Sequence, residues 1–512
     1  MITLRGSLTS KIDRLDPRFI ALSQASEQLA RKNSTLWGPA AASEATIRLN
    51  WVDFPHTSRR LLPELDALAA RFRHHKHVVL CGMGGSSLAP EVIAAAFNKE
   101  LFVLDSTDPN YLTRAFAGEL SQTVVVVSSK SGSTIETKSQ RALFEERFNR
   151  AGLNPTDHMI IVTDPDSPLD QDARNRGFTV VNADPHVGGR YSALSAFGLV
   201  PAALIGIDVS VLLDSASAAM QTLLGSQSPA IAMAYLLSYH ADQYLAFSDS
   251  DSAFPGLSDW IEQLIAESTG KDQRGRLPVV IESAQSPVGG DAVRIAFAGS
   301  SDLVISADLG AHFIFWEWVT ALLGYALHLD PFNQPNVTEA KNQTSTLLNK
   351  WSGKLPALVP DEIDGAIEIF TKSDSTQGAL TQIIDAVRSD GYIAIMAYLD
   401  RRGDEELAQL RRVLADKSGR PVTFGWGPRF LHSTGQFHKG GPGNGVFLQI
   451  TGEANEDIKI PGEEFTFHTL IMAQALGDAQ ALTSRNLTVV RLHLRNRQAG
   501  VAEILSAALS II

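Results

Sequence analysis

Apolar and polar positions form repeating blocks in the part of the chain that starts at residue 77. Five short apolar runs, rich in β-branched residues, are each followed by polar residues and then by a helical pattern. The runs are HVVLC (77–81), LFVLD (101–105), TVVVVS (123–128), MIIVTD (159–164) and FTVVN (178–182). Continuous apolar runs of this length are typical of strands buried on both faces, as in a parallel sheet. Their alternation with helices predicts a three-layer α/β domain.

A second, less regular series of apolar runs begins after about residue 215. It contains YLAFS (244–248), PVVIES (278–283), AVRIAFA (292–298), DLVIS (302–306), YIAIMAYLD (392–400), PVTFGW (421–426) and GVFLQI (445–450). Longer helical patterns at 309–329 and 336–350 interrupt it, and an amphipathic helical pattern at 12–33 precedes both series. We therefore expect a helical N-terminal segment with a connector over 1–55, a first α/β domain over 56–215 and a second over 216–512.

Composition narrows the function classes. A chain of 512 residues with 44% hydrophobic and 20% charged residues fits a soluble protein of more than one domain. The net charge of −12 disfavours general binding to nucleic acid or to an acidic membrane, so an anionic ligand needs a local binding device. The single cysteine, Cys81, excludes an internal disulfide and a cysteine-based zinc cluster. With no apolar run of membrane-spanning length and no signal-peptide pattern, we expect a cytoplasmic protein.

Two turns rich in glycine and serine follow strands of the first series, CGMGGSSLAPEV (81–92) and SSKSGSTIET (128–137). Ligands of parallel sheets bind outside the carboxyl ends of the strands, where the N–H groups of helix N-termini are free. Lys130 at such an N-terminus is disfavoured unless an anion is bound there. The hydroxyls could simply cap the helix, but they are more than capping requires: Ser128, Ser129, Ser131, Ser133 and Thr134. Since no Walker A pattern occurs, we expect a monophosphate site.

The stretch LSDWIEQLIAESTGKDQRGR (257–276) predicts a helix with apolar positions 257, 260, 261, 264 and 265 on one face. Glu267 falls on the apolar side near the helix end, and Gln263 lies four residues earlier on the same face. A carboxylate in this position suits a general base. The alternative is a boundary glutamate paired with Lys271.

Three further stretches carry candidate polar groups. Arg190 follows a Gly-Gly pair in HVGGRYS and could stabilise a developing oxyanion or form an interdomain salt bridge. Lys341 lies early in a predicted helix, where it could be either a site residue or an ordinary surface residue. His432 and His438 lie in the glycine-rich stretch GPRFLHSTGQFHKGG (427–441). Histidines in glycine-rich loops are better functional candidates than single histidines on apolar faces. No spacing resembles a zinc site, so no metal is expected.

Taken together, six stretches resemble phosphoglucose isomerases, two-domain proteins of the sugar isomerase (SIS) fold. They are GMGGSSLAPEV, SSKSGSTIET, GGRYSALSAFGLVPAALIG, IAESTGK, NQPNVTEAK and FLHSTGQFHKGGP. The resemblance covers roughly residues 35–495 and is nearest to the isomerase half of bifunctional transaldolase/phosphoglucose isomerase proteins. It implies two SIS-type three-layer α/β/α domains with parallel sheets. It also implies reversible interconversion of glucose 6-phosphate and fructose 6-phosphate without a cofactor. Because members of the family are commonly dimeric, a homodimer is expected as well.

The resemblance also implies roles for individual residues. Glu267 would move the proton between sugar C1 and C2 through a cis-enediolate, which Arg190 would stabilise, and Lys341 would act near the ring oxygen. The sugar would contact Gln263 and Gln334. The phosphate would bind at the second turn, to Ser129, Lys130, Ser131 and Thr134. Gly85 and Ser86 of the first turn would lie beside it.

The ring-opening histidine is open between three residues. The family's usual GTNGQH motif, between the glutamate and lysine segments, is missing from this chain. HSTGQFHKGG can be aligned with the family's HAFYQLIHQG with one gap. This alignment favours His432 over His438 as the acid/base. His438 is then expected to bind substrate. His312 in GAHFIF is the third candidate.

Two other functions remain open. The site could hold another anionic hexose, such as mannose 6-phosphate or a sulfonated sugar. The chain could also be a non-catalytic SIS protein that senses sugar phosphates. The sensor is disfavoured because the chain is acidic, shows no basic helix-turn-helix pattern and retains Glu267, Arg190 and Lys341.

Overall fold

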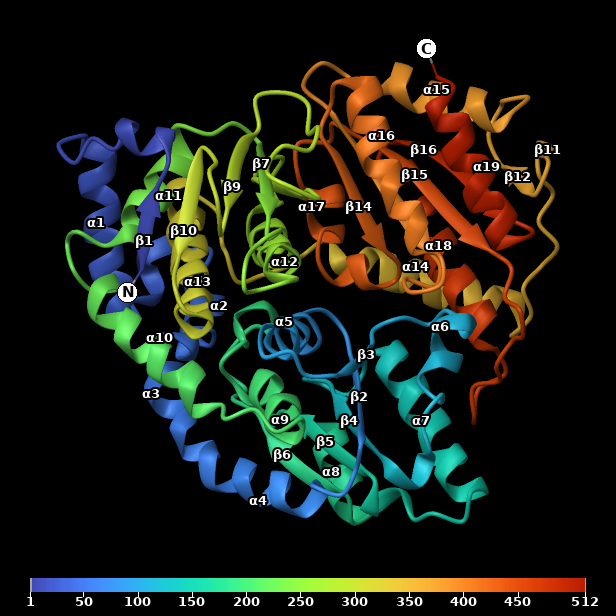
Figure 1. Cartoon of the computed structure of the whole chain (residues 1–512), viewed down its shortest axis with the longest axis horizontal. Helices are drawn as coiled ribbons and strands as arrows, with labels where there is room; N and C mark the ends of the chain where they lie inside the picture. Colours follow the sequence, from blue (N-terminus) through green and yellow to red (C-terminus); the bar gives the residue numbers. More distant parts are fainter. Residues whose placement is uncertain (1, 512) are drawn as a thin grey trace.

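The computed structural model describes residues 2–511, apart from the side chain of Ala340. The first sheet has the strand order β3-β2-β4-β5-β6 and is parallel throughout (Figure 1). Its strands are β2 (His77–Gly82), β3 (Phe102–Leu104), β4 (Thr123–Ser128), β5 (Met159–Thr163) and β6 (Thr179–Asn182). The five apolar runs thus form the five strands, and the predicted parallel α/β architecture is confirmed.

Alternate residues of these strands face two different helical layers, which explains their continuous apolar character. Val78, Leu80 and Val126 face the main hydrophobic core, whereas Val79, Cys81 and Val127 face a second cluster. On the first side lie α4 (Leu62–Phe72), α5 (Leu88–Ala96) and α9 (Ala196–Leu204), and on the second side lie α6 (Pro109–Arg114), α7 (Ile135–Arg150) and α8 (Pro168–Asn175).

The second sheet has the order β1-β10-β9-β7-β8. Strands β7 (Tyr244–Ser248), β8 (Leu277–Val280), β9 (Val293–Ala296) and β10 (Leu303–Ser306) are parallel, and β1 (Thr3–Arg5) adds to the edge in the antiparallel direction. The helices of this part are α1 (Pro17–Ala30), α2 (Ala42–Thr46), α3 (Phe54–Thr57), α10 (Ser210–Leu223), α11 (Pro229–Tyr239), α12 (Leu257–Thr269) and α13 (Leu309–Ala326).

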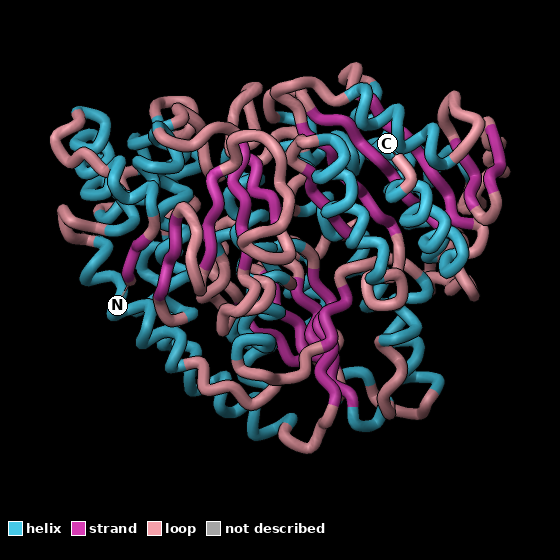
Figure 2. The backbone as a smooth tube through the Cα atoms, turned by 45° about the horizontal axis from the view of Figure 1, so that its top comes forward, coloured by secondary structure: helices cyan, strands magenta, loops and turns pink. Residues whose placement is uncertain are grey.

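A third sheet has the order β11-β12-β16-β15-β13-β14. Its strands are β11 (Glu362–Asp364), β12 (Ile367–Ile369), β13 (Tyr392–Tyr398), β14 (Val422–Trp426), β15 (Gly445–Gly452) and β16 (Thr488–Leu494). Its helices are α14 (Val337–Trp351), α15 (Thr376–Ala386), α16 (Gln409–Ser418), α17 (Gly435–Gly440), α18 (Phe467–Thr483) and α19 (Arg497–Leu509). Range 216–512, expected to be one domain, therefore holds two separate sheets, and Figure 2 shows both above the first sheet.

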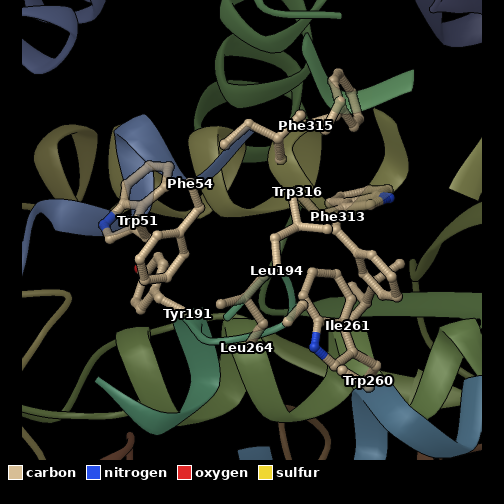
Figure 3. Close-up of a cluster of buried hydrophobic side chains, with 14 of the residues drawn as sticks. Trp51, Phe54, Tyr191, Leu194, Trp260, Ile261, Leu264, Phe313, Phe315 and Trp316 are labelled. Carbon is tan, nitrogen blue, oxygen red and sulfur yellow. The ribbon is translucent and has the colours of Figure 1, made fainter. Parts of the chain in front are cut away.

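The largest core anchors the segments that carry three candidate site residues, Arg190, Gln263 and Glu267 (Figure 3). Trp260 of α12 packs edge-on against Phe313 of α13, with ring centroids 4.9 Å apart. Tyr191, the neighbour of Arg190, stacks on Trp51 at 5.2 Å. The apolar face of α12 and the turn at Tyr191 are thus fixed by packing, which positions the polar residues beside them.

Across residues 2–511, the search for membrane-spanning helices found none with the required length and apolar character. Cys81 is a buried free thiol in β2.

Candidate active site

The hydroxyl-rich turn joins β4 to α7, and its lysine is already paired. Lys130 Nζ lies 2.5 Å from Asp164 Oδ2 and donates to the Pro185 carbonyl at 3.1 Å. Burial lowers the pKa of Lys130, and the carboxylate of Asp164 opposes that shift. Lys130 therefore ties this turn to the ends of β5 and β6, and its charge is compensated by Asp164 within the protein.

Several polar groups at the start of α7 remain open to a ligand. Thr134 occupies the N-cap, yet its side chain makes no capping hydrogen bond. The hydroxyls of Ser128 and Thr137 are buried and without a partner among residues 2–511. Ser129 and Ser131 shape the turn, since the Ser129 hydroxyl accepts from Gly132 N at 3.1 Å and Ser131 bonds to Ser133 at 2.7 Å. Free N–H groups and hydroxyls at a helix N-terminus form an anion site.

The glycine-rich turn after β2 packs directly against two other parts of the molecule. A Cβ on Gly84 would lie 2.8 Å from both Gln263 Nε2 and the His432 carbonyl. A Cβ on Gly85 would lie 2.0 Å from the Gly189 carbonyl, and the following Ser86 is buried. Glycine is required here because any side chain would push these segments apart.

Glu267 lies near the end of α12 with both carboxylate oxygens held. Its Oε1 is 3.1 Å from Arg190 Nη1, and its Oε2 accepts a hydrogen bond from Gln263 Nε2 at 3.0 Å. The side chain is 11% exposed, so the carboxylate retains limited access from outside. A fixed orientation and limited exposure are the properties that a general base needs.

Lys271, the alternative partner considered for Glu267, instead binds backbone and amide oxygens. Its Nζ donates to the carbonyls of Asp330 and Asn333, each at 2.6 Å, and to Asn333 Oδ1 at 2.9 Å. Burial lowers the pKa of Lys271 to about 7, and the charge of Arg190 adds to this effect. Arg190, then, is the ion-pair partner of Glu267.

Arg190 is buried and its five N–H groups are matched by five contacts. Nε donates to Ser268 Oγ at 2.8 Å, and Nη2 donates to the carbonyls of Pro331 and Asn333 at 2.8 and 3.0 Å. Nη1 donates to Gln334 Oε1 at 2.7 Å and also faces Glu267. The guanidinium thus joins the end of α12 to the loop that precedes α14.

His432 faces a buried carboxylate from the first domain. Its Nε2 lies 3.0 Å from Glu136 Oε1, which also accepts from Gln474 Nε2 of α18 at 2.8 Å. Burial by itself would raise the pKa of Glu136, but the charge and hydrogen bond of His432, with the charge of Lys341, bring it below its ordinary value. Lys341 is exposed in the first turns of α14, within electrostatic reach of Glu136.

Gln263 connects the two titratable groups. Its Nε2 donates both to Glu267 Oε2 at 3.0 Å and to the His432 carbonyl at 2.8 Å. The structure therefore brings Glu267, Arg190, Gln263, Gln334 and His432 together, with Glu136 and the glycine-rich turn at their side. These residues come from all three sheet-containing parts of the chain.

His438 and His312 lie in different surroundings. His438 is buried with its Nδ1 2.8 Å from the Tyr392 hydroxyl, and its ring stacks on the Tyr392 ring. His312 is fully buried between the rings of Phe254 and Phe297. Burial lowers the pKa of each imidazole to about 3, so both are neutral near pH 7. Neither has a hydrogen bond to the Glu267–His432 group within the described residues.

The sequence indicated no role in the candidate site for Glu136 or Gln436. The one available signal for Glu136 was an acid in the first turn of the helix that follows the hydroxyl-rich turn. Gln436 is completely buried and donates to the Gly270 carbonyl and to Asn336 Oδ1, both at 2.8 Å, while its Oε1 accepts from Asn336 N. It fastens the end of α12 to the start of α14, and only the folded structure shows that these segments meet.

In the portion of the chain that the structure describes, no group of three or more histidine, cysteine, aspartate or glutamate residues could hold a metal ion. A cavity of about 1110 Å³ lies elsewhere, lined among others by Arg114, Asp400 and Glu453.

This chain is similar to known proteins in sequence and in structure. Residues 66–277 match the family model described as phosphoglucose isomerase. The probable glucose-6-phosphate isomerase of Haloquadratum walsbyi is 34% identical over 227 residues, which are 42% of this chain and 52% of that protein. A glucose-6-phosphate isomerase of Thermus thermophilus is 32% identical over 282 residues, 51% of this chain and 66% of that protein.

A solved structure shares the fold. The crystal structure of a glucose-6-phosphate isomerase from Chlamydia trachomatis superimposes with a TM-score of 0.55 at 19% identity, covering 69% of this chain and 89% of that one. The chain spans about half the length of the first curated relative, and the family match includes Arg190 and Glu267 but ends before Lys341 and His432. Over residues 66–277, this chain is similar to proteins of the phosphoglucose isomerase family.

Proposed function

We propose that this protein is a glucose-6-phosphate isomerase that interconverts glucose 6-phosphate and fructose 6-phosphate. The observation that carries the proposal is the link through Gln263, which holds both Glu267 and the backbone of His432 beside the glycine-rich turn. A carboxylate base and an imidazole close to an anion-binding helix N-terminus suit proton transfer on a phosphorylated sugar.

The substrate phosphate would bind at the start of α7. The first-turn N–H groups and the hydroxyls of Ser129, Ser131 and Thr134 would surround it, with Gly85 and Ser86 beside them. The unpartnered hydroxyls of Ser128 and Thr137 add further donors. Lys130 would support this site by holding the turn through Asp164, and it would touch the phosphate only by leaving that carboxylate.

His432 would open the sugar ring. With Nε2 engaged by Glu136, Nδ1 is the ring nitrogen that has no hydrogen bond within residues 2–511. The neighbouring carboxylate of Glu136 fixes the orientation of the imidazole through this contact. Lys341 would act from α14 near the ring oxygen, as the resemblance implies.

Glu267 would then remove the C2 proton and return it at C1. Arg190 and Gln263 each hold one of its carboxylate oxygens, so the base is oriented before substrate binds. Because every N–H of Arg190 has a protein acceptor, a direct hydrogen bond to the enediolate would require one of these acceptors to be displaced. The positive charge of the guanidinium acts on the enediolate without such a change. Positioned acid–base groups typically contribute about 10²–10⁴-fold in rate, and a proton shift between carbons requires no redox cofactor.

The test is an isomerisation assay on purified protein with fructose 6-phosphate, mannose 6-phosphate and a sulfonated hexose in separate reactions. We expect glucose 6-phosphate to form from fructose 6-phosphate at the highest rate. Turnover of only another sugar, or binding without turnover, would contradict the proposal and favour the other isomerase or the sensor. The homodimer that the resemblance implies stays a prediction, which a sedimentation measurement can test.

A further inference from the structure

Four charged side chains join the third-sheet part of the chain to the first domain. Arg401 Nη1 lies 2.7 Å from Glu91 Oε1, and Arg429 Nη2 lies 2.5 Å from Glu91 Oε2. Arg429 Nη1 is 3.2 Å from Asp105 Oδ2, and Arg401 Nε is 3.5 Å from Asp105 Oδ1. Each arginine thus meets both acids, and we name these four residues the charge square.

The charge square is largely shielded from water. The Asp105 side chain is 1% exposed, those of Arg401 and Arg429 are 15% and 14% exposed, and that of Glu91 is 29% exposed. Arg401 also donates to the Tyr111 hydroxyl at 3.0 Å and to the Val103 carbonyl at 3.2 Å. Burial by itself would raise the pKa of Glu91, but the two arginines lower it to about 2. Removing one member of such a set leaves one largely buried charge in excess, which is unfavourable.

The charge square lies at one end of the short segment that carries His432. Arg429 is the first residue and His432 the last of the 3-10 helix Arg429–His432. Glu91 is in the first turn of α5, immediately after the glycine-rich turn whose Gly84 abuts the His432 carbonyl. The first domain therefore grips this helix at both ends, through Glu91 and Asp105 at Arg429 and through Glu136 at His432.

We propose that the charge square is the docking device that sets His432 opposite Glu136, and that Arg429 and Glu91 are positioning residues for the acid–base step. The catalytic part of this inference rests on the proposed function, whereas the docking part does not. A displacement of a catalytic group by about 1 Å can lower the rate by about 10²-fold. Loss of the charge square should therefore act on turnover more than on substrate binding, because the phosphate turn is not part of it.

The test compares Arg429→Met and Glu91→Gln with Arg411→Met as a matched control. Arg411 is also buried, and it pairs with Glu282 at 2.5 Å to join α16 to the second sheet, away from the His432 helix. Steady-state kinetics and hydrogen exchange of peptides covering 427–440 are measured on each full-length variant. We expect kcat to fall about 10- to 100-fold with KM within about threefold in the first two variants, together with faster exchange at 427–440. Arg411→Met should leave both close to wild type.

Two more variants sharpen the result. The double variant Arg429→Met with Glu91→Gln should lose little more kcat than either single change, because both act through one contact. Arg429→Lys keeps the charge and should recover part of the rate, and it replaces Arg429→Met if that protein does not fold. The proposal is overturned if exchange at 427–440 and kcat stay at wild-type values without Arg429 or Glu91, or if Arg411→Met loses as much. If wild type isomerises no sugar, the proposed function fails, and the exchange data alone decide whether the charge square docks this helix.

Discussion

The three histidines that the sequence offered as ring-opening candidates lie in three different surroundings. His432 meets a carboxylate, His438 a tyrosine hydroxyl, and His312 two phenylalanine rings. The motif alignment favoured His432, and its pairing with Glu136 supports that choice as a proposal. The partner could not be predicted, because Glu136 and His432 are separated by 296 positions and lie in helices of different parts of the chain.

The buried His312 leads to a prediction about stability and pH. Its folded pKa of about 3 lies below the ordinary 6.5, so between these values the unfolded chain binds more protons than the folded one. The free energy of unfolding that this residue contributes therefore falls as the pH drops below about 6.5, by about 1.4 kcal/mol per pH unit. In His312→Leu, the loss of stability between pH 7 and pH 5 should be smaller by about 2 kcal/mol.

Urea denaturation at both pH values measures this difference. His56→Leu serves as the control for the replacement of a histidine as such, because His56 is exposed and this variant keeps the buried His312. An identical pH dependence in His312→Leu and wild type would show that His312 does not titrate in this window.

Among elements, strands were predicted better than the contacts between turns. Continuous apolar runs located the first sheet, whereas β16 was missed because Arg491 and His493 interrupt its apolar pattern. The short strands β1, β11 and β12 were missed as well, because each of these three-residue strands includes a charged residue and forms no apolar run. The two glycine-rich turns were found, but the packing of Gly85 on Gly189 depends on tertiary structure.

That packing can be tested by adding one methyl group. Gly85→Ala would place its Cβ 2.0 Å from the Gly189 carbonyl, so the turns at Gly85 and Arg190 must separate. Overpacking of this kind typically costs about 1–3 kcal/mol, and misplacing Arg190 should lower kcat/KM by at least about tenfold. Thermal unfolding and steady-state kinetics report the two effects.

Gly189→Ala is the matched control for this change. A Cβ on Gly189 meets nothing within 4 Å, so stability and activity should stay close to wild type. Equal behaviour of the two alanine variants would mean that the close approach of Gly85 to Gly189 has no influence on the site.

For the whole molecule, the sequence predicted α/β architecture with parallel sheets correctly, but not the number of sheets. Apolar runs identify strands without stating which sheet they join, and the boundary between the second and third sheets falls among long helices, α13 and α14. The candidate site lies where the three parts meet, so most of its contacts join distant segments. The likeness to bifunctional transaldolase/isomerase proteins stays a prediction.

Glu267, the proposed catalytic base, shares helix α12 with a second buried glutamate that provides a control. Glu262 also lies buried on α12, and burial raises its pKa well above the ordinary value, which favours its uncharged form. Replacing either glutamate by glutamine changes little in size, but only Glu267→Gln removes the proposed base.

The decisive measurement is the rate at which purified wild type, Glu267→Gln and Glu262→Gln convert fructose 6-phosphate into glucose 6-phosphate. Binding of 6-phosphogluconate to each variant serves as the check that the site is intact. We predict that Glu267→Gln loses at least about 10²-fold in kcat while still binding 6-phosphogluconate, and that Glu262→Gln keeps a rate close to wild type. A near-normal rate in Glu267→Gln would contradict the assignment of the base.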